Sequence, residues 1–166
     1  MFYATWLDGF GDAAEVRIGF RMGAGQVRVA KLLSEKAMYF TFTIAVYATG
    51  VFFLLAMYLP GWLTPDPTLQ RMLFDIIPLV GFANIWMVTG MVAYAVIGAQ
   101  GRITTATFLE FFISWGIGVP LAAIMTMVFN YNLEGIVASM TITYTIGTNM
   151  YLYMLYTSDW EALSGT

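Results

Sequence analysis

The sequence predicts an all-helical membrane protein, a bundle that crosses the bilayer several times. Of its 166 residues, 60% are hydrophobic and only 10% are charged, whereas a soluble domain carries about 25% charged residues. Four stretches contain no charged residue, and each is long enough to span a hydrocarbon core of about 30 Å. They run Ala37–Pro65, Ile76–Gly101, Phe111–Leu133 and Gly135–Ser158.

The opening segment, from Gly9 to Lys31, is both helix-like and charged. At about 100° per residue, Asp8, Asp12 and Glu15 fall on one face of this helix. Carboxylates within a membrane are costly unless they face a wet cavity or a partner. We therefore take Asp12 and Glu15 as candidate sites for a cation or a cationic substrate, although acids near a helix start are also favoured by the helix dipole alone.

With the opening helix, we expect five membrane helices in a single domain covering residues 1–166. The approximate ranges are 4–24, 38–59, 74–99, 106–129 and 134–157. Asn84, Tyr144 and Asn149 are polar side chains inside these ranges. They are candidates for lining a solute path, or they form hydrogen bonds between helices. Pro120 interrupts the fourth range and predicts a bend, either a hinge or a static kink.

The residues that are absent or scarce exclude several functions. The chain has no histidine and no cysteine, which removes the commonest general base and the thiolate metal ligands. We expect no enzyme activity, no catalytic or metal site and no cofactor. The net charge of −3 leaves no basic face for nucleic acid.

The distribution of lysine and arginine predicts the orientation in the membrane. If the predicted helices alternate in direction, six of the seven basic residues fall on one face, which the positive-inside rule places in the cytoplasm. The amino-terminal basic loop and the carboxy terminus are then cytoplasmic. The sequence favours neither the plasma membrane nor a vacuolar or other organellar membrane.

The opening stretch resembles the eighth transmembrane helix, and the loop after it, of multidrug and toxic compound extrusion (MATE) transporters. Ten residues match the motif of eukaryotic members without a gap: Gly9, Gly11, Ala13, Arg17, Ile18, Gly23, Ala24, Gly25, Ala30 and Lys31. Two later stretches, around Gly101 and around Pro120, are similar to helices ten and eleven of that family. The resemblance covers nearly the whole chain.

The resemblance implies a partial carboxy-terminal lobe, helices eight to twelve, of a twelve-helix antiporter. Such a transporter exports organic cations and xenobiotics in exchange for H⁺ or Na⁺ by alternating access. Its partners would be the lipid bilayer, small organic cations and the amino-terminal lobe of the same transporter. The family's acidic residue of helix ten aligns with Met87, and its helix-eight serine aligns with Glu15. We therefore hypothesise that Glu15, one turn from Asp12, replaces the usual coupling acid.

Two alternatives remain at this stage. One is a truncated or non-transporting membrane scaffold that only inserts and associates with partners. The other is an intramembrane aspartyl protease, because Gly9-Phe10-Gly11-Asp12 matches the short GxGD signature of those enzymes. That chemistry requires a second aspartate within a few ångströms, and Asp75 stands only at the edge of a predicted span.

Overall fold

The computed structural model describes residues 2–129 and 133–163, including their side chains except at 2–8, 59, 63 and 163. Every regular element in these ranges is a helix, which confirms the all-helical fold class. The elements are α1 (Phe2–Gly23), α2 (Val27–Ala56), α3 (Leu59–Leu63), α4 (Pro67–Ala99), α5 (Ile103–Ile113), the π-helical turn η1 (Ser114–Gly118), α6 (Val119–Met127), α7 (Leu133–Tyr156) and α8 (Trp160–Leu163).

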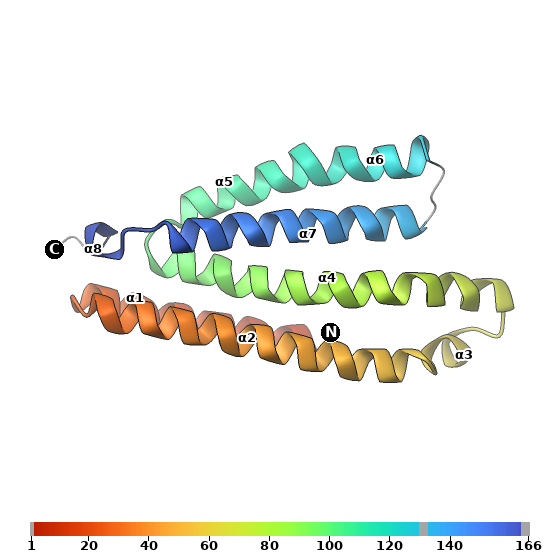
Figure 1. Cartoon of the computed structure of the whole chain (residues 1–166), viewed down its shortest axis with the longest axis horizontal. Coiled ribbons are helices and arrows are strands. Elements are labelled where there is room, and N and C mark those ends of the chain that lie inside the picture. Colours follow the sequence, from red (N-terminus) through yellow and green to blue (C-terminus); the bar gives the residue numbers. More distant parts are fainter. Residues whose placement is uncertain (1, 130–132, 164–166) are drawn as a thin grey trace.

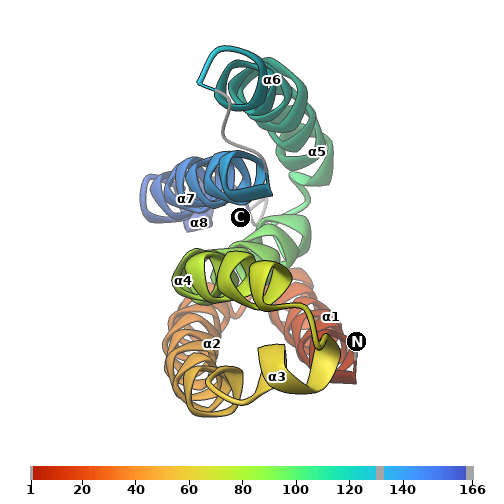
Figure 2. The same ribbon diagram turned by 90° about the vertical axis from the view of Figure 1, so that its right-hand side faces the viewer.

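Helix α4 is the centre of the bundle. The long helices run side by side (Figure 1), and α4 packs against α1, α2, α5 and α7. Viewed end-on, α1 and α2 lie below α4 and α5 and α7 above it, with α1 and α5 toward the right and α2 and α7 toward the left (Figure 2). The main core is formed by small and branched residues of these helices, among them Ile18, Ala93, Val96 and Ile97.

The helices have the length and composition of membrane spans. Val27–Ala56, Pro67–Ala99 and the continuous Ile103–Met127 segment are long and apolar enough to cross a membrane. Helices α1 and α7, with 22 and 24 residues, are about 33 and 36 Å long at 1.5 Å per residue. Large apolar side chains such as Tyr39, Phe108 and Phe112 point outward, and a soluble monomer rarely exposes so many. The chain is therefore an integral membrane protein.

Two helices begin earlier than their apolar runs. Helix α2 starts at Val27 rather than near residue 38, and α4 starts at Pro67 rather than near residue 74. The expected starts followed the first uncharged residues, but a helix continues past the bilayer core where charged side chains are solvated. Lys31, Glu35 and Lys36 therefore lie on the first turns of α2.

Two tight turns join helices at the same end of the bundle. Gly25, after α1, has φ 72°, and Gly101, after α4, has φ 76°. In each turn, the amide after the glycine donates to a carbonyl five residues back: Gln26 to Arg21 at 2.9 Å, and Arg102 to Ile97 at 3.2 Å. These are Schellman motifs, in which only glycine adopts the left-handed conformation without strain. We call this end, which also holds α8 (Figure 1), the basic end, because α1, α2 and Arg102 bring basic side chains to it.

The bend expected at Pro120 takes the form of a π-helical turn just before this residue. Proline has no amide hydrogen, so it cannot donate to the carbonyl one helical turn earlier. The chain widens into η1 over Ser114–Gly118 just before it, as helices do at π-bulges. Figure 1 shows α5 and α6 joined through η1 as one bent rod. Gly118 faces α7, where an added Cβ would lie 3.2 Å from Thr143.

Asp66 caps the start of α4 and yields a first prediction. Its Oδ1 accepts a hydrogen bond from the Thr68 amide at 2.8 Å, satisfying a donor that the helix itself leaves free. We expect Asp66→Ala to lower the free energy of unfolding by about 1 kcal/mol. A thermal unfolding curve in detergent would measure this. Asp75→Ala, on an exposed position of the same helix, should change it much less. Equal effects of the two substitutions would contradict a capping role.

Candidate functional site

A cavity of about 370 Å³ lies on the α1 and α5 side of α4. Its walls come from α1, α4, α5, η1 and α7, and the backbones of α1 and α5 do not approach each other closely. Three carboxylates line it: Asp12 and Glu15 from α1, and Glu110 from α5. None of the three forms an ion pair among the residues that the structure describes. We call this space the acidic cavity.

Glu110 is held at the wall of the acidic cavity by Tyr151. The Tyr151 hydroxyl of α7 donates a hydrogen bond to Glu110 Oε2, and the tyrosine ring is 3% exposed. The Tyr94 ring meets the Tyr151 ring edge-on, with centroids 5.9 Å apart, while the Tyr94 hydroxyl is 2.8 Å from Thr107 Oγ1. The buried tyrosine holds the carboxylate in place, and the second carboxylate oxygen forms no hydrogen bond with a described residue.

Glu15 lies against the backbone of α4. A Cβ added to Gly98 would be 2.7 Å from Glu15 Oε1, so the carboxylate occupies the space that a side chain at position 98 would need. One turn earlier on α1, Gly11 faces Ala95, with a hypothetical Cβ 3.8 Å from the Ala95 Cβ. Small residues at the α1–α4 contact let the acidic face of α1 approach α4 closely.

The candidate polar residues divide into two groups. Tyr144 lines the acidic cavity with Asp12 and Glu15. Asn84 instead bridges α4 and α2, donating from Nδ2 to Thr49 Oγ1 at 3.1 Å, and Asn149 donates to the Thr145 carbonyl one turn back on α7 at 2.7 Å. These two asparagines serve contacts between helices and within α7, and neither lines the acidic cavity.

The residues of the resemblance motif have mainly structural positions. Gly25 and Gly101 form the left-handed turns described above. Gly9 and Gly23 have no neighbouring atom within 4 Å of an added Cβ. Arg17, Lys31 and Pro120 are all exposed, and Pro120 follows the π-helical turn.

Sequence reasoning missed Glu110. No role was predicted for this residue, which directly precedes the uncharged run Phe111–Leu133. The available signal was its position inside the expected helix 106–129, where an acid is functional by default. Met87, which aligns with the family's helix-ten acid, also lines the acidic cavity. The carboxylates of this cavity come instead from α1 and α5.

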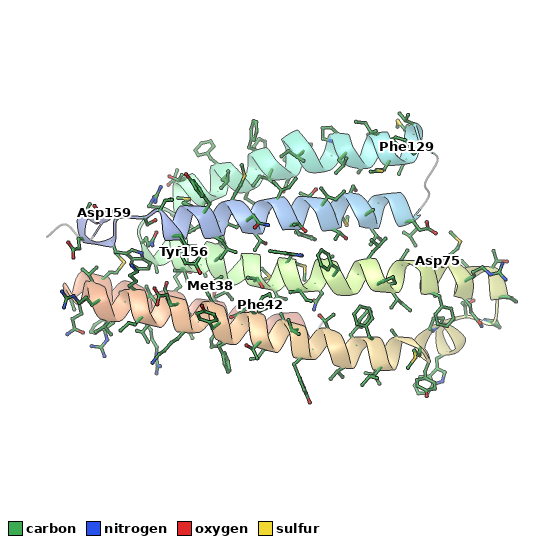
Figure 3. All side chains as sticks on the ribbon, in the orientation of Figure 1. Met38, Phe42, Asp75, Phe129, Tyr156 and Asp159 are labelled. Carbon is green, nitrogen blue, oxygen red and sulfur yellow. The ribbon has the colours of Figure 1, made fainter. Side chains whose placement is uncertain are left out.

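The position of Asp75 removes the geometric basis for an aspartyl protease. It is on α4 near the end of the bundle opposite α8 and Asp159 (Figure 3), and it does not line the acidic cavity. The acids that share this cavity with Asp12 are Glu15 and Glu110. The side chain of Asp8 lies outside the described residues.

Comparisons with known proteins agree on one family. A family model described as MatE matches residues 1–124. An uncharacterized transporter of Schizosaccharomyces pombe is 29% identical over 128 residues, which cover 77% of this chain and 24% of the relative. Protein DETOXIFICATION 38 of Arabidopsis thaliana is 24% identical over 92% of this chain and 30% of the relative. The chain therefore spans less than a third of the length of these curated relatives.

A solved structure has the same arrangement of helices. The crystal structure of the eukaryotic MATE transporter AtDTX14 superposes with a TM-score of 0.88 and 16% sequence identity. The superposition covers 96% of this chain and 36% of that one. At this identity the comparison establishes the fold.

Proposed function

Because the chain belongs to the MatE family of transporters, we propose that it forms the carboxy-terminal lobe of an exporter of organic cations. The observation that carries this proposal is the acidic cavity, in which Asp12, Glu15 and Glu110 lack ion-pair partners among the described residues. A cationic solute supplies the missing positive charge. The volume of about 370 Å³ falls in the range of small-molecule sites.

The aromatic side chains of the acidic cavity favour an organic cation over a fully hydrated ion. Tyr94, Tyr144 and Tyr151 all line it. An aromatic face attracts an ammonium group and contributes about 0.5 to 2 kcal/mol. Carboxylates supply charge, and the rings supply an apolar surface for the rest of the solute.

The export of the organic cation is coupled to the entry of H⁺ or Na⁺ because both ligands compete for the same carboxylates. A proton or a sodium ion neutralises Glu110, Glu15 or Asp12, and the organic cation is then released because its counter-charge is lost. Each ligand favours a different arrangement of two lobes, which is alternating access. We propose no further cofactor. In this proposal the protein transports its substrate without chemical change and works together with an amino-terminal lobe of the same transporter.

The basic end faces the cytoplasm in this proposal. Arg17, Arg21, Arg28, Lys31, Lys36 and Arg102 belong to the half of the bundle at that end, while Arg71 belongs to α4 near its other end. This six-to-one division satisfies the positive-inside rule. The carboxy-terminal α8 is at the basic end (Figure 1) and is cytoplasmic as well.

Binding of tetraphenylphosphonium to the purified protein tests the competition. We expect its dissociation constant to rise as the pH falls or as Na⁺ is added, because either cation takes the counter-charge on which the organic cation depends. Isothermal titration calorimetry in detergent measures it. A dissociation constant that does not change with pH or with added Na⁺ would contradict the proposal.

A further inference from the structure

A second cavity lies on the other side of α4, between α2 and α7. These two helices both pack against α4, but their backbones do not approach each other closely, and a cavity of about 240 Å³ remains between them. We call it the α2–α7 groove. Figure 3 shows Met38 and Phe42 on α2 and Tyr156 on α7, all of which line it.

The inner part of the α2–α7 groove is apolar. Met38 and Phe42 form the wall on α2, and Leu152 and Leu155 form the wall on α7. Thr89 of α4 also lines it, but its hydroxyl already donates to the Ile85 carbonyl at 2.7 Å. No part of this inner surface requires a polar ligand, so it suits a hydrocarbon chain.

The mouth of the α2–α7 groove carries two opposite charges. Lys31 and Glu35 are four residues apart on α2, so they lie on one face of the helix, and both line the groove. Neither forms an ion pair with a described residue. Between them stands Ser34, which is 5% exposed and whose hydroxyl has no hydrogen-bond partner in the described part of the chain. A ligand with both an anionic and a cationic group is therefore complementary to the mouth.

The depth of the α2–α7 groove matches one leaflet of a bilayer. From Lys31 to Phe42 the helix rises about 16 Å at 1.5 Å per residue, about half of the 30 Å hydrocarbon core. Lys31 is near the basic end, and Trp160 and Tyr156 line the groove there, at the depth where such rings favour the lipid–water interface.

We propose that the α2–α7 groove binds one molecule of phosphatidylethanolamine. Its phosphate contacts Lys31 and Ser34, its primary ammonium contacts Glu35, and one acyl chain lies between Phe42 and Leu152. Phosphatidylcholine has no N–H donor for Glu35, and phosphatidylglycerol has no cation. The headgroup chemistry therefore selects the ethanolamine lipid. This site is separate from the acidic cavity, and its occupation does not depend on transport.

Native mass spectrometry of the purified protein with equal amounts of the three lipids tests the site. We expect one bound phosphatidylethanolamine, preferred over phosphatidylcholine by about fivefold, the effect of one exposed charge-assisted contact. Glu35→Gln should abolish this preference, and Lys31→Gln should lower retention of all three phospholipids. Lys36→Gln is the matched control, because Lys36 does not line this groove.

A second measurement leaves Lys31, Ser34 and Glu35 at the mouth of the groove unchanged. A benzophenone-bearing amino acid in place of Phe42 should yield an adduct with the mass of one phospholipid after illumination of the protein in membranes. A cross-link to another polypeptide segment instead would mean that protein covers the groove, and the proposal would be overturned. Equal retention of the three lipids by the unsubstituted protein, or a loss of preference with Lys36→Gln, would overturn it too.

Discussion

Replacing Glu110 with glutamine is expected to weaken the binding of an organic cation by tenfold to a hundredfold. The substitution keeps the size and shape of the side chain but removes the negative charge from the wall of the acidic cavity. A hydrogen bond or contact to a charged group is worth about 1.5 to 3 kcal/mol, which corresponds to this range of affinity. Titration of the purified protein with tetraphenylphosphonium measures the change.

The matched control for Glu110→Gln is Asp75→Asn. Asp75 is an exposed acid near the other end of α4 (Figure 3), so its neutralisation changes the net charge equally without touching the acidic cavity. We expect it to leave the dissociation constant unchanged. Tyr151→Phe, which removes the hydroxyl that donates to Glu110, should have an intermediate effect. If Asp75→Asn weakened binding as much as Glu110→Gln, the effect would come from overall charge and not from the cavity.

The second large effect is expected at Gly90, where α4 and α7 meet. A Cβ added to Gly90 would lie 2.6 Å from Thr148 Oγ1 and 3.9 Å from the Thr148 Cα. Thr148 is fixed, since its hydroxyl donates to the Trp86 carbonyl of α4 at 2.7 Å. Gly90→Leu must push the two helices apart and break this hydrogen bond. We expect a loss of about 1 to 3 kcal/mol from overpacking and about 1 kcal/mol more from the hydrogen bond.

A glycine on an open face separates packing from helix propensity. Gly50 of α2 is exposed and has no atom within 4 Å of an added Cβ. Gly50→Leu should leave the melting temperature unchanged or raise it, because leucine favours a helix over glycine by about 0.8 kcal/mol. Thermal unfolding of both variants in the same detergent makes the comparison. Similar destabilisation by both would show that the α4–α7 contact tolerates the larger residue.

The fold class follows from the sequence because its signal is local. Uncharged runs of more than twenty residues predict membrane helices whatever packs against them. The positions of the helix ends are not predicted in this way, because a charged residue such as Lys31 can lie within a helix as well as beyond its end. Pro120 predicts a bend but not the π-helical turn at Ser114–Gly118, where Gly118 faces Thr143 of α7.

The acidic cavity depends on which helices become neighbours, and this is not local information. The helical wheel of α1 brings Asp12 and Glu15 together because both are on one element. Glu110 joins them only because α4 packs against both α1 and α5. Conversely, Asn84 and Asn149 are polar residues within spans like Tyr144, yet their amides bond to Thr49 and to the Thr145 carbonyl. Nothing in the sequence distinguishes a polar residue that lines the cavity from one that forms a hydrogen bond to a neighbouring helix or within its own helix.

The glycine turns after α1 and α4 have a mechanical consequence. Each joins two antiparallel helices with a short connection closed by backbone hydrogen bonds, so we expect each helix pair, α1 with α2 and α4 with α5, to move as a rigid unit. Between these helix pairs and the opposite end, proline removes a hydrogen bond from the helix ladder at Pro120 and also at Pro78 of α4, but only Pro120 is preceded by a widened turn. When the lobe changes shape, we expect α6 to swing about Ser114–Gly118 while the spacing within the helix pairs α1–α2 and α4–α5 stays the same.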